Sequence, residues 1–303
     1  MPWQVKCLAD NLKSLIPFSS SLRRFKHQHR VYRSPLSRGD WTLQEGLDQL
    51  DWLVAQRDLT GSVVLEVGSG WEPIIPLLFA MAGAKRVYMT DLNRLCSPSS
   101  LQWTLECLIR NRNPILSRLA VTPERFTQLT RPDAYQSFEA GLRQAGLYYL
   151  APCDCRNLSQ LESGSIDIVT SRAVLEHIPG PIIDQILAES YRLLAPGGLC
   201  CHFVDTSDHW QHNDPAITRV NFLRFSEFTY RLTSINKLNY HNRFRHPDYV
   251  QRLQAAGFAL LREERELDQP SLRALTTMKV DARFQGYSPE DLATTGSYLL
   301  GSK

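Results

Sequence analysis

One short apolar run ending in a glycine-rich turn constrains the fold of this chain more than any other feature. Residues 63–67 read VVLEV and are followed directly by Gly68, Ser69 and Gly70. A nearly continuous apolar run of this length is typical of a strand buried on both faces of a parallel sheet. Glycines after it permit positive φ angles and a close approach of backbone to a ligand. The run therefore predicts a central strand with a binding turn at its carboxyl end.

Further apolar runs alternate with segments whose apolar residues recur at helical spacing. This alternation predicts an α/β fold, a doubly wound and mostly parallel seven-stranded sheet with helices on both faces. A helix is expected to begin at Asp40, with Thr42 and Glu45 as a capping box. The expected strands cover residues 63–67, 86–91, 147–151, 166–170, 199–204, 258–262 and 297–300.

Composition and charge divide the chain into a main domain with two additions. Residues 1–58 form a basic, helical N-terminal extension, since no acid occurs between Asp10 and Asp40. Residues 59–303 form the main domain. Within it, residues 206–245 interrupt the alternation and are rich in basic and aromatic side chains. We expect this insertion after the fifth strand to cover a substrate, although a helical lid with a solvated basic face also fits the pattern.

The net charge, hydrophobicity and cysteine content of the 303 residues exclude several classes of protein. A formal net charge of +3 is too small for a chain that binds nucleic acid along its whole length. The longest apolar stretch, residues 74–84, contains Pro76 and is too short to span a bilayer. The seven cysteines are an odd number without zinc-ligand spacing, which favours reduced thiols in the cytoplasm. The sequence does not fix the oligomeric state.

An acid at the end of the second expected strand limits which ligands the glycine turn is expected to bind. Asp91 lies 21 residues after Gly70, where a carboxylate can accept hydrogen bonds from ribose hydroxyls. A dinucleotide site requires the pattern G-x-G-x-x-G, but its third glycine position is Pro73 here. S-adenosylmethionine has no pyrophosphate and needs only the first tight turn. The turn and the acid therefore favour S-adenosylmethionine over a dinucleotide.

Taken together, six motifs in order resemble the class I, seven-stranded S-adenosylmethionine-dependent methyltransferases. The resemblance covers about residues 60–205, and the third glycine frequent in the family's first motif is Glu72 here. The resemblance implies S-adenosylmethionine as the cofactor. The matching pieces are VLEVGSG at 64–70, Asp91, Asp154, IDIV at 166–169, LEHI at 175–178 and LAPGG at 194–198.

The resemblance also implies roles for individual residues. The glycine turn would hold the methionine part of the cofactor, oriented by Glu66, and Asp91 would bind the ribose. Asp154 would contact the adenine amino group, although an aspartate there is also typical of a turn. Two residues expected just past the fourth strand would pass close to the cofactor through their backbone. The predicted cofactor-binding set is Glu66, Gly68, Ser69, Gly70, Asp91, Leu92, Asp154, Cys155, Ser171 and Arg172.

Three histidines are candidates for a general base, since a pKa near 6.5 suits proton transfer. His177 follows the fourth strand at the catalytic edge, where it could instead only shape the cofactor pocket. His209 and His212 follow the fifth strand. Their spacing, with Asp205 or Asp208, is also compatible with a metal site, but without a stronger ligand pattern we expect no metal.

The expected reaction is methyl transfer to a hydroxyl of a small-molecule acceptor, because histidines and acids gather near the predicted pocket. Transfer to a small-molecule amine is the main alternative. Methylation of RNA or DNA is disfavoured, since residues 171–174 read SRAV and lack the motif of enzymes that methylate base amines. A non-catalytic cofactor-binding protein is a further alternative, which the intact glycines, Asp91 and Asp154 argue against.

Overall fold

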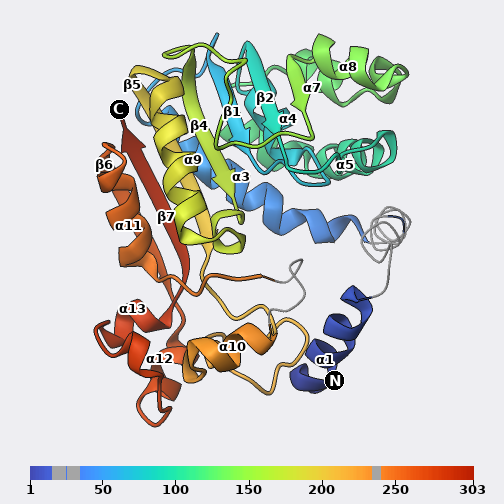
Figure 1. The fold of residues 1–303 in the computed structure, drawn as a ribbon. Helices are drawn as coiled ribbons and strands as arrows, with labels where there is room; N and C mark the ends of the chain where they lie inside the picture. Colours follow the sequence, from blue (N-terminus) through green and yellow to red (C-terminus); the bar gives the residue numbers. More distant parts are fainter. Residues whose placement is uncertain (16–24, 26–34, 234–239) are drawn as a thin grey trace.

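The computed structural model describes residues 1–15, 25, 35–233 and 240–303 and contains one seven-stranded sheet (Figure 1). The strand order is β3-β2-β1-β4-β5-β7-β6. Strands β1 to β5 pair in parallel, whereas β7 pairs antiparallel with both β5 and β6. The predicted fold class is thus confirmed. The strands are β1 (Val63–Val67), β2 (Arg86–Thr90), β3 (Leu147–Leu150), β4 (Ile166–Arg172), β5 (Leu194–Asp205), β6 (Ala259–Leu267) and β7 (Thr294–Ser302).

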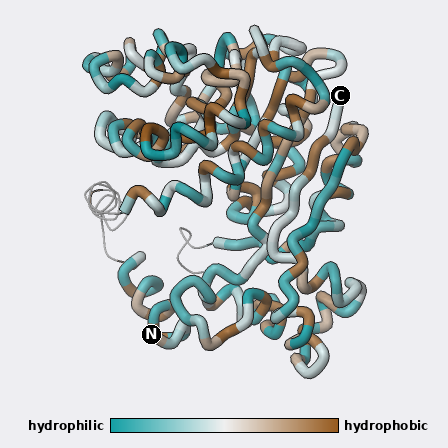
Figure 2. Tube along the Cα trace, turned by 180° about the vertical axis from the view of Figure 1, so that it is seen from behind, coloured by the Kyte–Doolittle hydropathy of each residue, from teal (hydrophilic) through white to brown (hydrophobic). Residues whose placement is uncertain are grey.

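Helices cover both faces of this sheet and bury two separate hydrophobic cores. One core lies under α3, α4 and α5, and the other under α9 and α11. Figure 2 shows hydrophobic residues concentrated along the strands and the helices that face them. The helices are α1 (Trp3–Ser14), α3 (Asp40–Val54), α4 (Ile74–Met81), α5 (Pro98–Arg110), α6 (Arg112–Arg118), α7 (Pro123–Thr130), α8 (Phe138–Gln144), α9 (Gly180–Leu193), α10 (Glu227–Thr233), α11 (His246–Ala255), α12 (Gln269–Leu275) and α13 (Pro289–Ala293).

Helix α3 begins at Asp40 as expected, but the predicted capping box is wrong. The N-cap residue is Gly39, which has helical φ and ψ angles and forms no side-chain cap. A 3-10 turn, Leu36–Gly39, leads directly into the helix, so the position of the cap is already helical. Thr42 therefore lies inside the first turn, where its side chain does not cap the helix.

The fourth strand is longer than the sequence indicates. It extends to Arg172, so Ser171 and Arg172 lie within β4 and not just past it. They stay paired because β5 is long enough to place His202 and Phe203 opposite them.

A third, smaller core lies beyond the carboxyl ends of the parallel strands. Residues that follow β5 pack there against the segment between β6 and β7. Helix α10 belongs to this layer, and α1 lies beside it (Figure 1). No helix within the described ranges is long and apolar enough to cross a membrane. The members of this core are Val220, Phe222, Leu223, Tyr230, Phe284 and Leu292.

Candidate functional site

The turn between β1 and α4 is built by two glycines with left-handed backbone. Gly68 has a φ of 76° and Gly70 a φ of 64°. The N–H of Gly68 donates to the carbonyl of Thr90 over 2.9 Å. A Cβ on Gly68 would lie 2.6 Å from a methyl carbon of Val174, whereas one on Gly70 would meet nothing within 4 Å. Gly68 thus allows packing, and Gly70 borders open space.

Asp91 stands next to this turn at the end of β2. Its carboxylate accepts hydrogen bonds from the N–H of Gly70 at 3.2 Å and of Asn93 at 2.9 Å. Burial raises the pKa of Asp91 above its ordinary value. Leu92, the next residue, is exposed. The carboxylate therefore lies beside the glycine turn, where ribose hydroxyls of a nucleoside could donate to it.

Two buried oxygen atoms at the turn, one on Glu66 and one on Ser69, have no hydrogen-bond partner. Glu66 is buried, and one of its carboxylate oxygens accepts no hydrogen bond. Burial raises the pKa of Glu66 to about 7. The hydroxyl of Ser69 is likewise buried without a partner. Unsatisfied buried polar atoms are rare unless a ligand completes them. Together with the open space at Gly70, they fit a polar ligand such as the amino-acid part of S-adenosylmethionine.

The loop after β3 approaches the same site. The N–H of Cys153 donates to the carbonyl of Asp91 over 2.7 Å. The carboxylate of Asp154 accepts from the backbone N–H and the guanidinium of Arg156, which holds its pKa below the ordinary value. The Cys155 sulfur is buried 3.0 Å from the hydroxyl of Thr90. In this structure Asp154 thus makes turn contacts, and its adenine-binding role stays a prediction.

The last two residues of β4 face different surroundings. The Ser171 hydroxyl lies 2.8 Å from Nδ1 of His202, inside the sheet. The Arg172 guanidinium lies 4.0 Å from the centre of the Trp41 ring, and its Nε and one Nη have no hydrogen-bond partner. Burial lowers the pKa of Arg172, while Glu45 and Glu176 oppose this effect. Arg172 is therefore a poorly solvated cation at the carboxyl edge of the sheet.

The three candidate histidines lie together beyond the ends of β4 and β5. The ring centres of His177 and His209 are 5.1 Å apart, and those of His209 and His212 are 5.3 Å apart. Nδ1 of His177 lies 2.9 Å from the carbonyl of Tyr240. Because a carbonyl only accepts, Nδ1 carries the proton and Nε2 keeps its lone pair. Burial lowers the pKa of His177, which favours the neutral ring.

Asp205 ends β5 within this cluster. Its Oδ2 lies 3.4 Å from Nε2 of His209. Burial opposes its ionisation, but the nearby His209 ring and the N–H of Ser207, which donates to Oδ1 over 2.9 Å, outweigh burial and hold the pKa of Asp205 below its ordinary value. Asp205 therefore supplies a fixed negative charge beside the histidines.

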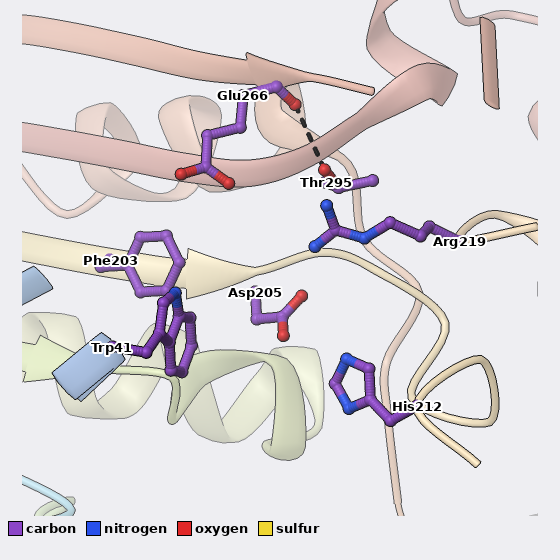
Figure 3. A pocket seen from close by; sticks show the side chains of 7 residues that line it. All are labelled: Trp41, Phe203, Asp205, His212, Arg219, Glu266 and Thr295. Atoms are coloured by element: carbon purple, nitrogen blue, oxygen red, sulfur yellow. Dashed lines mark hydrogen bonds between the residues drawn. The ribbon is translucent and has the colours of Figure 1, made fainter. Parts of the chain in front are cut away.

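A cavity of about 290 Å³ opens next to this cluster (Figure 3). The side chains of Asp205, His212 and Arg219 point into it from the segment that ends β5 and follows it. Aromatic rings on one side and charged groups on the other suit a ligand that is partly apolar and partly polar. The lining residues are Trp41, Phe203, Asp205, His212, Arg219, Glu266 and Thr295.

A cation could bind at one place in the cluster, with a different ligand set from the one the sequence suggests. Ligand atoms of Glu176, His177 and His209 all lie within 4.8 Å of one another. In contrast, the rings of His209 and His212 stack with 20° between their planes. The positive charge of Arg172 already acts on the carboxylate of Glu176, so it disfavours the binding of a metal cation at the same place.

Sequence reasoning missed several groups at this site. His241 is buried with its ring centre 4.8 Å from that of His209. Trp41 and Glu45 reach the site from α3, which the sequence assigns to an extension. The Glu45 carboxylate accepts from the Tyr298 hydroxyl, and burial raises its pKa to about 7. In the sequence, the one sign that α3 contributes to the site is the presence of polar residues such as Glu45 on its otherwise apolar face.

The strand order and one family match indicate the class of this protein. The strand order, with an antiparallel β7 inserted beside β5, is that of the Rossmann-like class I methyltransferases. Residues 118–202 match the sequence model of a family described as a methyltransferase domain. This match and the fold together indicate a class I methyltransferase, an enzyme whose methyl donor is S-adenosylmethionine.

Solved structures with a similar fold include three methyltransferases. One from Mesorhizobium loti is 14% identical, with a TM-score of 0.44 over 83% of this chain and 95% of that one. One from Methanosarcina mazei is 16% identical, with a TM-score of 0.42 over 80% and 92%. The phosphoethanolamine N-methyltransferase 2 of Haemonchus contortus is 17% identical, with a TM-score of 0.42 over 80% and 49%. Curated protein sequences give no significant match.

Proposed function

We propose that this enzyme transfers the methyl group of S-adenosylmethionine to a hydroxyl of a small-molecule acceptor, with His177 as the general base. Methyl transfer is an in-line displacement, in which the enzyme mainly aligns the acceptor with the methyl group. A hydroxyl becomes an effective nucleophile when a base removes its proton. The acceptor would occupy the cavity beside Asp205 and His212.

The state of the His177 ring carries this proposal. Its Nδ1–H is donated to the carbonyl of Tyr240, so the lone pair of Nε2 is available to accept a proton. The lowered pKa keeps this nitrogen unprotonated at neutral pH. His209 would position His177 and the acceptor, and His212 would contact the acceptor from the cavity wall.

The cofactor would bind along the carboxyl ends of β1, β2 and β4. In this assignment Gly68, Ser69 and Gly70 hold the methionine part, Glu66 orients the turn, and Asp91 binds the ribose. Leu92, Asp154 and Cys155 would line the adenine, while Ser171 and Arg172 would contact the cofactor through their backbone. The bound cofactor supplies an electrophilic methyl group on a sulfonium, and the protein supplies position and the base.

The free state of the cysteines supports a reducing compartment such as the cytoplasm. All seven cysteines are free thiols, and six of them are buried. Disulfides are rare in reducing compartments, which agrees with this state.

The substitution His177→Gln tests the base. We expect the single-turnover rate of methyl transfer to fall by about 10²–10⁴-fold, the usual contribution of a general base. Because the pKa of His177 is lowered, the wild-type rate should be constant above pH 7 and should decrease only below the ordinary histidine pKa of about 6.5. The rate of the variant should lack this decrease.

Cofactor affinity, measured by calorimetry, provides the control. It should be unchanged in His177→Gln, so that a slower rate reports the chemical step. A single-turnover rate equal to that of the wild type would exclude His177 as the base. In that case a neutral amine, which needs no base, becomes the better acceptor.

A further inference from the structure

Half of the exposed large hydrophobic side chains in the described part of the chain gather around two short helices. Of fourteen such side chains, seven lie on or beside α1 and α10. Monomeric proteins rarely expose contiguous apolar patches of this kind without a partner. We name this patch the α1–α10 surface. It consists of Met1, Val5, Leu8, Leu12, Leu15, Phe228 and Leu232.

Helix α1 has one side that is buried against the protein and another, apolar side that is exposed. Trp3, Cys7 and Asn11 follow one another at spacings of four residues and are buried. Leu8 and Leu12 share another side of the helix and are 61% and 56% exposed. Since α1 is already anchored through its buried side, the exposed side is not needed for contact with the fold.

Helix α10 continues the same surface. The side-chain amide of Asn11 donates to the carbonyl of Leu232 over 2.9 Å, so α1 and α10 lie side by side (Figure 1). Phe228 and Leu232 are one helical turn apart and are 75% and 52% exposed. Two adjacent helices thus each carry exposed apolar side chains.

The charged side chains on these two helices include one more base than acid, and the sequence that follows α1 is strongly basic. Lys6 and Lys13 lie on α1, and Arg231 lies on α10 with its side chain 78% exposed. The acids on these helices are Asp10, which forms ion pairs with both lysines, and Glu227, which forms one with Arg231, so three bases stand beside two acids. In the sequence, residues 11–39 contain seven lysines and arginines and no acid. A positive charge of this kind is complementary to anionic lipid headgroups.

We propose that the α1–α10 surface docks on the surface of an anionic lipid bilayer. An apolar face flanked by basic residues, on helices that cannot span a membrane, is the pattern of a helix lying in the interface. Leu8, Leu12 and Phe228 would insert between the lipids, and the lysines would contact the headgroups. A second copy of the chain would bury the apolar side chains but would repel this positive charge.

Vesicle sedimentation of the full-length protein tests the proposal. Binding to vesicles of phosphatidylcholine with phosphatidylglycerol should exceed binding to pure phosphatidylcholine by about tenfold or more, and should decrease with salt. The double substitution Leu8→Glu/Leu12→Glu should weaken binding by more than about tenfold. The matched control is Ile109→Glu, which changes a 47% exposed side chain on α5 and should bind as the wild type does.

Circular dichroism should show equal melting temperatures for all three proteins, because the substituted side chains are exposed. Equal binding to both kinds of vesicle, or a double variant that binds as well as the wild type, would overturn the proposal. So would light scattering that shows a wild-type dimer and a monomeric double variant, since the occupant would then be a second copy.

Discussion

At the scale of single residues, Gly68 and Gly70 share a left-handed backbone but serve different purposes. A side chain on Gly68 would collide with Val174, so this glycine allows two segments of protein to pack. A side chain on Gly70 would collide with nothing in the protein. Gly70 therefore borders open space, and we expect substitution of the two glycines to separate an effect on stability from an effect on cofactor binding.

We expect Gly68→Ala to lower the free energy of unfolding by about 2–4 kcal/mol, since backbone strain and overpacking add. Gly70→Ala should cost only the strain of about 1–2 kcal/mol but should weaken binding of S-adenosylmethionine. Gly164, with a φ of 71° and open space, offers the matched control Gly164→Ala, which should leave the affinity unchanged. Denaturant unfolding and calorimetry measure both effects. Equal affinities of the Gly70 and Gly164 variants would remove the turn from the cofactor site.

The histidine cluster permits a second test at this scale, because a base and a metal ion would use the same side chains. We expect treatment with a chelator to leave the methyl-transfer rate unchanged, since Arg172 already places a positive charge near Glu176 and Asp205. The measurement is the single-turnover rate before and after chelation. A loss that Zn²⁺ or Mn²⁺ restores would instead assign Glu176, His177 and His209 as metal ligands.

At the scale of elements, α3 links the core to the site. Leu43, Leu47 and Leu50 are buried in the same core as β1. On another side, the amide of Gln49 donates to the carbonyl of Ser171 over 3.0 Å, at the end of β4. The spacing of the leucines predicts the helix, because a buried stripe determines periodicity. It does not predict what the polar residues of α3 contact, since these contacts are with strands more than a hundred residues away.

Substitutions within α3 should show that the stability of the fold depends on the buried leucines of this helix. Leu47→Ala should lower the free energy of unfolding by about 2–5 kcal/mol, because Leu47 is buried and its removal leaves a cavity. Val54→Ala, at an exposed position of the same helix, should change it by less than about 0.5 kcal/mol. Thermal unfolding followed by circular dichroism measures both. Similar losses in the two variants would show that α3 does not depend on its apolar stripe.

At the scale of the whole molecule, the sheet was predictable and the site only in part. Each strand has a local apolar run, so all seven were expected, as were the glycine turn and Asp91 after their strands. The antiparallel direction of β7 has no local signal, because it depends on how the chain returns to the sheet. The contact of His177 with Tyr240, which joins residues 63 positions apart, could not be predicted for the same reason.

The attachment of α1 has a practical consequence for work with this enzyme. The N–H of Trp3 donates to the Asp214 carboxylate over 2.9 Å, and the Trp3 ring packs 6.2 Å from that of Trp210. Both partners belong to the segment that carries His209 and His212. We therefore expect that removing α1, or fusing a purification tag to it, disturbs the wall of the proposed acceptor cavity and lowers the measured methyl-transfer rate.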